Sequence, residues 1–207
     1  MFRAGAQSGI SALVRRAIRF CSDRRGVAAV EFAFIVPVLL VMYFVTMEAS
    51  QAIETSKKVS RTSSMVADLI TQQPTIVKAD LTAIMKIASS GLRPYNRSVP
   101  DITVTAIQVT DETTPKAQVA WSWQVVNGAY GVGAAKNTIT TVPTTLKIAG
   151  TFLIRVEANL KYQPIITWSA DSAQRLGLTS AFNQITMDEI YYLRPRRSPT
   201  IPCVDCP

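Results

Sequence analysis

The sequence predicts an α+β protein in which an amino-terminal transmembrane helix continues into a stem helix, and an antiparallel sheet head follows. Three observations predict this class. Residues 32–47 are sixteen consecutive positions without charge, and almost all of them are apolar. The next segment, to about residue 70, keeps apolar residues at helical spacing. From residue 100 the spacing changes to alternation, which is typical of half-buried strands.

Residues 1–26 are predicted to be a basic cytoplasmic leader. They hold six arginines and one aspartate, so they supply +5 of the net charge of +8 and leave +3 for the remainder. Lys and Arg concentrate in the cytoplasmic flank of a membrane span. The charge therefore indicates topology and does not predict nucleic-acid binding. Residues from 48 onward are expected to be exported.

Residues 27–47 are the predicted transmembrane helix. Val27 to Val30 extend the apolar run to about 20 residues, the length that crosses a bilayer. Pro37 is expected to kink this helix without ending it, because neighbouring groups can satisfy the backbone carbonyl that the proline frees. A secretory signal peptide fits less well, since its apolar run is usually about 7 to 15 residues.

Glu31 places a carboxylate at the edge of the span. An unpaired charge inside a membrane helix costs about 2.5 to 3.5 kcal/mol on insertion scales, so a compensating positive charge is expected. Cleavage between Gly26 and Val27 would create one, because the new α-amino group, with a reference pKa of about 7.7 to 8.0, would lie one helical turn from Glu31. The alternative is an uncleaved signal anchor in which Glu31 marks the edge of the span.

The run from Arg25 to Pro37 resembles the TadE/TadG-like proteins of tight-adherence (Tad, Flp-type) pilus systems. Residues 187–197 are similar to the close of TadE-like proteins, where an apolar and aromatic segment leads into Arg-Pro-Arg. The stretch 171–175 lacks the second serine of an Asp-x-Ser-x-Ser adhesion motif. The chain therefore resembles the small TadE-like kind and not the larger TadG-like members.

The resemblance implies a pilin-like fold and a role for each residue of the run. A prepilin peptidase would cut after Gly26, next to the basic flank formed by Arg24 and Arg25, and Glu31 would become the fifth residue of the mature chain. The resemblance also implies a single-pass protein of the bacterial inner membrane with a cytoplasmic amino terminus and a periplasmic carboxyl-terminal domain. Its partners would be the membrane, the peptidase, other pilins and Tad assembly proteins.

Residues 48–95 are predicted to hold the stem and a second helix. The stem should run to about Ile70 and end before Pro74, because the residue that precedes a proline disfavours helix. The second helix should begin with Asp80 as its N-cap and end at Gly91. Its expected buried face is Leu81, Ile84, Met85 and Ala88.

Residues 96–207 are predicted to form the antiparallel β head with a basic, cysteine-containing tail. Alternation predicts strands that include residues 102–105, 118–125 and 152–162, and a last strand around residues 185–192. Ile107 and Val109 shift the phase of the first strand, which predicts a bulge. One face of the sheet is expected to be wet and the other to be covered by helices.

Residues 127–150, between the second and third predicted strands, form a long Gly- and Thr-rich loop in this interpretation. Gly128 to Gly133 does not predict a phosphate loop, since no Lys-Ser/Thr follows and no strand-to-helix transition surrounds it. Trp121 and Trp123 are expected in the core, on the same face as Val119. Trp168 remains open as a contact residue.

Cys203 and Cys206 lie three positions apart at the carboxyl end. An oxidising periplasm would close them into a disulfide, and two free thiols are the alternative. A zinc site is disfavoured because the chain has no histidine and the pair offers only two ligands. No metal and no cofactor are predicted.

The absence of histidine removes the commonest general base and every Ser-His or Cys-His nucleophile pair, so neither an enzyme nor a small-molecule substrate is expected. Together with the resemblance, the sequence predicts a minor pseudopilin that acts structurally in assembly of an adhesive pilus. The alternative is an uncleaved, membrane-anchored periplasmic binding or adhesion protein that uses residues 127–150 or Trp168 as its contact surface.

Overall fold

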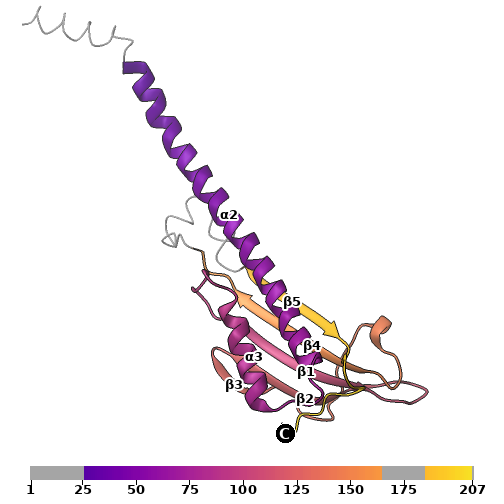
Figure 1. Cartoon of the computed structure of the whole chain (residues 1–207). Helices are drawn as coiled ribbons and strands as arrows, with labels where there is room; N and C mark the ends of the chain where they lie inside the picture. The colour runs from indigo at the N-terminus through magenta and orange to yellow at the C-terminus, as the bar shows by residue number, and fades with distance from the viewer. Residues whose placement is uncertain (1–25, 165–184, 207) are drawn as a thin grey trace, which may run out of the picture. The chain divides into compact units, whose positions relative to one another are not determined.

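A computed structural model describes residues 26–164 and 185–206 of the chain (Figure 1). The leader with Arg24 and Arg25, the Asp171 stretch and Trp168 lie outside the described residues. Contacts divide the chain into two compact units, one that ends at Ala49 and one that begins at Ser50. The described chain is α+β, as predicted, with a long amino-terminal helix and an antiparallel sheet.

Helix α2 runs without interruption from Val27 to Thr71, which are 45 residues. Pro37 lies inside it, and the helix continues beyond the proline. The predicted end near Ile70 is therefore confirmed. Residues 27–49 of α2 belong to the first unit and residues 50–71 to the second.

Within the second unit, residues 50–71 of α2 and helix α3 (Lys78–Ser90) cover one face of the sheet (Figure 1). Burial of a large aliphatic side chain stabilises a fold by about 1.5 to 3 kcal/mol, and the larger of the two clusters of buried apolar residues lies between these helices and the sheet. The predicted buried face of α3 is confirmed. The main core includes Val59, Val66, Ile70, Leu81, Ile84, Met85, Ile102, Val104, Ile154 and Val156.

The predicted N-cap of α3 is wrong. The helix begins at Lys78, its N-cap position is Val77, and Asp80 lies inside its first turn. Val77 has no side-chain oxygen, and the Lys78 N–H instead donates to Oδ1 of Asp205 at 2.8 Å. Local sequence rules search for a cap among the neighbouring residues, whereas this acceptor lies 127 positions away. At its other end α3 finishes at Ser90 with Gly91 as the C-cap, so the predicted end of the helix is confirmed.

The sheet has five antiparallel strands in the order β3-β2-β1-β4-β5 (Figure 1). This confirms the predicted antiparallel sheet and the last strand. The strands are β1 (Asp101–Val109), β2 (Ala117–Val126), β3 (Ala129–Val132), β4 (Phe152–Lys161) and β5 (Thr186–Leu193).

Strand β3 lies where a loop was predicted. It forms a hairpin with β2 through Asn127 and Gly128, whose φ angles of 50° and 78° are those of a type I′ turn. At the end of β3 a Cβ on Gly133 would collide with Oγ of Ser122, so only glycine allows this close approach. Gly128 and Gly133 therefore have structural roles in the hairpin formed by β2 and β3.

The bulge is present, but it lies in β2 and not in β1. Ala106 pairs with Trp121 and Ile107 pairs with Val119, so Ala120 is the extra residue. The pairing of β1 with β4 is continuous through the same positions. Because directly paired residues share a face and neighbours along a strand do not, Val119 faces away from Trp121. The prediction that these two share a face is wrong.

The second face of the sheet is not simply wet, which corrects a further prediction. A small second core forms there, and the 3-10 helix η2 (Thr144–Leu146) lies in the segment that covers it. The phase shift of β1 reflects this cover, since Ile107 and Val109 face the second core. Its members are Ile107, Val109, Ala117 and Leu153, with Val142, Leu146 and Tyr192 packed against them.

Candidate functional site

Residues 27–47 of α2 expose nearly all of their apolar side chains. Phe32 is 67% exposed and Phe34 74%, whereas Val66, farther along the same helix, is fully buried. The most apolar window of the helix has a mean hydropathy of 2.4 and none of it is buried within the chain. A core helix of a soluble protein would be covered by its own chain, so this stretch needs lipid or other chains around it.

Gly26, Val27 and Glu31 lie at the beginning of this stretch. Gly26 and Val27 are exposed, and a Cβ on Gly26 would meet no atom within 4 Å. Glu31 is exposed and follows Val27 by four positions in a continuous helix, so both lie on the same helix face. An amino group at Val27 would therefore lie one helical turn from the carboxylate of Glu31.

Residues 26–68 match the family model described as TadE-like protein. These residues are TadE-like. The TadE-like segment begins at Gly26, contains Glu31 and Pro37, and ends inside the stem, so it confirms the resemblance at these positions. The same segment contains the part of α2 that is long and apolar enough to cross a membrane once. No curated protein and no solved structure matches the chain.

Beyond the apolar stretch, the stem of α2 buries several hydroxyls without leaving them unsatisfied. Thr55 donates to the carbonyl of Gln51 at 2.8 Å, and Ser63 donates to that of Val59 at 2.9 Å. Each hydroxyl therefore uses the carbonyl four residues earlier, which allows a polar side chain on a buried helix face. These residues explain why the stem is only mildly apolar and yet packs on the head.

Lys58 connects the stem to the turn that follows α3. Its Nζ lies 2.8 Å from Oε1 of Glu54 and donates to the carbonyl of Arg93 at 3.2 Å. The hydrogen bond and the positive charge of Lys58 hold the pKa of Glu54 below its ordinary value. Glu54 is thus an exposed acid with a partner of its own, which makes it a useful control for Glu31.

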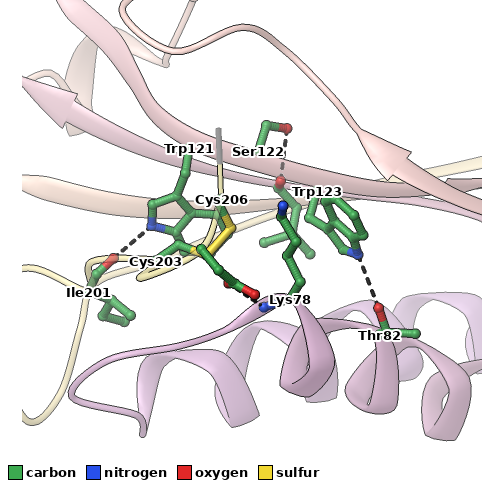
Figure 2. The surroundings of a disulfide bond; sticks show 10 residues. Lys78, Thr82, Trp121, Ser122, Trp123, Ile201, Cys203 and Cys206 are labelled. Atoms are coloured by element: carbon green, nitrogen blue, oxygen red, sulfur yellow. Dashed lines mark hydrogen bonds between the residues drawn. A yellow bond between two sulfur atoms is a disulfide. The ribbon is translucent and has the colours of Figure 1, made fainter.

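The two tryptophans of β2 are used inside the head. The Trp121 indole N–H donates to the carbonyl of Ile201 at 2.7 Å, and the Trp123 indole N–H donates to Oγ1 of Thr82 in α3 at 3.2 Å (Figure 2). Trp121 is 3% exposed, so the prediction of a core position is confirmed for it. Trp123 is partly buried and packs against the same core.

The carboxyl-terminal tail is fastened to the head and is not a solvated extension. Arg196 Nη2 lies 2.8 Å from Oδ1 of Asp68, and its backbone N–H donates to the carbonyl of Thr71. Farther on, Cys203 and Cys206 are joined in a disulfide (Figure 2). With Asp205 they group three atoms that resemble a metal-ligand set, but sulfurs bonded to each other are not the thiolates that bind a metal.

A cavity of about 350 Å³ lies beside the bulge of β2 and the tail. Its volume falls in the range of small-molecule sites, which is about 300 to 1,000 Å³. Trp121 and Phe152 supply aromatic wall, and Lys136 supplies a cation. The indole N–H of Trp121 is already bonded to the tail, so the cavity offers fewer free polar groups than its lining suggests.

Proposed function

We propose that this protein is a minor pseudopilin that acts structurally in assembly of a Tad/Flp-type adhesive pilus. A prepilin peptidase cuts between Gly26 and Val27, and the chain then takes its place in the inner membrane or the filament. The observation that carries the proposal is the coincidence of the TadE-like match with an exposed apolar helix whose beginning holds Gly26 and Glu31.

The mechanism is electrostatic pairing followed by lateral helix packing. An unpaired charge at the centre of a membrane helix costs about 2.5 to 3.5 kcal/mol, and a carboxylate near the edge of the span is disfavoured by a smaller amount of the same kind. The amino group created at Val27 neutralises Glu31 of the same chain or of a neighbour, because at four positions' spacing both lie on one face. The exposed side chains from Phe32 to Tyr43 then pack against lipid and against other pilin helices.

The leader orients the chain. Its arginines, including Arg24 and Arg25, stay in the cytoplasm, where the peptidase cuts, and the sheet head is exported to the periplasm. The apolar helix spans the inner membrane once. The head then makes the contacts with other assembly proteins, and no chemical step is assigned to it.

Replacement of Glu31 tests the pairing. Glu31→Gln removes the charge and keeps the shape, so the variant should insert into the membrane at least as well as the natural chain and should no longer support piliation. Glu54→Gln is the matched control, because Glu54 lies in the TadE-like segment but already has Lys58 as its partner. Normal piliation of the Glu31→Gln strain would contradict the mechanism.

A permanently anchored periplasmic binding protein is the second candidate, and the cavity beside Trp121 is the observation that favours it. This candidate needs no cleavage and no pairing at Glu31. It predicts that Glu31→Gln has no effect, and that Lys136→Ala, which alters the cavity wall, abolishes function. The pseudopilin proposal predicts instead that Glu31→Gln abolishes piliation and that Lys136→Ala has no effect on it.

A further inference from the structure

The last residues of the described chain form a small covalent ring at the surface of the head. The disulfide joins Cys203 to Cys206 and encloses Val204 and Asp205. Both cysteines are partly exposed, and Val204 is 75% exposed. Both cysteines also pack against the edge of the main core, so the ring lies between the core and the surface.

Asp205 of this ring accepts a hydrogen bond at the start of helix α3, where the N-cap residue Val77 makes no side-chain cap hydrogen bond. The first backbone N–H groups of a helix have no partner within the helix and carry a partial positive charge. Val77 cannot satisfy them, and Oδ1 of Asp205 accepts from the Lys78 N–H at 2.8 Å. Figure 2 shows the ring against this end of α3. The negative carboxylate also complements the helix dipole.

The chain that leads to the ring is held by backbone bonds to the segment between α2 and α3. The Ile76 N–H donates to the carbonyl of Pro202 at 3.1 Å, and the Val204 N–H donates to the carbonyl of Ile76 at 3.0 Å. Ile201 is fully buried, and its carbonyl accepts from the indole of Trp121. The tail thus closes over the core as one short parallel pairing.

Without the ring, the position of Asp205 would depend on an open surface segment. Asp205 is exposed, and its hydrogen bond to the Lys78 N–H ties it to the head. A disulfide across four residues removes most of the conformations that the open segment would otherwise sample. Closure of the ring therefore positions the carboxylate for α3.

We propose that Cys203 and Cys206 are a modification site, closed after export by a dithiol-disulfide oxidoreductase, and that closure locks the tail by capping α3. The export step rests on the proposed function. One cysteine thiolate attacks the disulfide of the oxidoreductase, forms a mixed disulfide and releases one enzyme thiolate. The second cysteine attacks the sulfur of the first and releases the other, so two electrons and two protons pass to the oxidoreductase.

Hydrogen exchange of the full chain in detergent micelles tests whether the closed disulfide holds Asp205 at the start of α3. The protein is compared with its disulfide closed and after reduction with a thiol reductant, and exchange of the amides around Lys78 is measured by mass spectrometry. Loss of an N-cap should speed this exchange by roughly fivefold in the reduced protein. Equal exchange in the two states would overturn the proposal.

Variants of the cap separate the carboxylate from the ring. Asp205→Ala should speed exchange at Lys78 even with the disulfide closed, whereas Asp205→Asn keeps an acceptor oxygen and should restore most of the protection. Asp111→Ala, in the exposed loop after β1, is the matched control and should leave exchange unchanged. Protection in the Asp205→Ala protein equal to that of the natural chain would also overturn the cap.

Thiol trapping in cells tests the oxidation step by itself. The pair should be protected from alkylation in cells that contain the oxidoreductase and should react in cells that lack it. A pair that is reduced in the exported head would overturn the modification and leave the pseudopilin proposal standing. Conversely, the exchange measurements do not depend on cleavage or piliation. If the protein proved not to be a pseudopilin, the difference in exchange between the closed and the reduced protein would still be expected.

Discussion

Residues 27–47 and residues 50–71 belong to the same helix and use their apolar side chains in opposite ways. In the first stretch Phe32, Phe34 and Met42 are more than half exposed, and in the second Val59, Val66 and Ile70 are buried against the sheet. Apart from Glu31, the first stretch is almost entirely apolar, whereas the second places apolar residues on one face only. Composition and periodicity both separate the two stretches. The first contains one charged residue, Glu31, whereas the second contains Glu54, Lys57, Lys58, Arg61 and Asp68.

This difference shows which environment each stretch requires. A one-sided apolar face is satisfied by the head of its own chain, and an all-round apolar surface is satisfied only by lipid or by other helices. Substitutions in the second stretch should therefore change the free energy of unfolding of the head. Substitutions in the first should change membrane insertion or assembly and leave the head unaffected.

The largest expected effect comes from a charge placed in each stretch. Val66→Asp buries a carboxylate in the core and should destabilise the head by about 4 kcal/mol or more. Val38→Asp places the same group in the span, where it should weaken insertion by about 2.5 to 3.5 kcal/mol. Tryptophan fluorescence during denaturation measures the first effect, and extraction from membranes measures the second. A stable head in Val66→Asp would contradict the assignment of the core.

A smaller effect is expected from truncation of a side chain. Ile154→Ala leaves a cavity under the helices and should lower the free energy of unfolding by about 2 to 5 kcal/mol. Ile35→Ala truncates an exposed side chain and should leave the head's denaturation midpoint unchanged. Urea titration of both full-length variants in detergent measures this. A shift of the Ile35→Ala midpoint by a comparable amount would remove the distinction between the two stretches.

The smallest effect is expected from loss of one hydroxyl. Thr82→Val removes the acceptor of the Trp123 indole N–H, and the unfolding free energy should fall by roughly 1 kcal/mol. Thr46→Val removes a hydroxyl that bonds only to the carbonyl of Met42 in the same helix, and the head should keep its stability. Thermal melts compare the two variants. Equal melting temperatures would show that the contact between α3 and β2 adds nothing measurable.

The features that follow from local periodicity could be predicted from the sequence. The end of α2 near Ile70, the buried face of α3 and the antiparallel pairing all depend on spacing over a few residues. The run around Gly26 and Glu31 was also recognisable, because its residue types are contiguous in the chain. The family model matches this same part of the chain, residues 26–68.

The features that depend on distant partners could not be predicted. The acceptor at the start of α3 is Asp205, which no local capping rule would select. The change of face at Ile107 and Val109 predicts a bulge in β1, but these two residues belong to the second core, and the extra residue is Ala120 of β2. Strand β3 could not be predicted, because its four residues, three of them exposed, carry no apolar alternation.

The amino-terminal sequence of the protein extracted from membranes tests the central claim most directly. The account predicts a mature chain that begins at Val27 in cells with an active prepilin peptidase, and its absence in a Gly26→Val variant. Gly131→Val is the matched control, because a Cβ atom at either glycine meets no atom within 4 Å, and this variant should be processed normally. A chain that still begins at Met1 in cells with active peptidase would contradict the account.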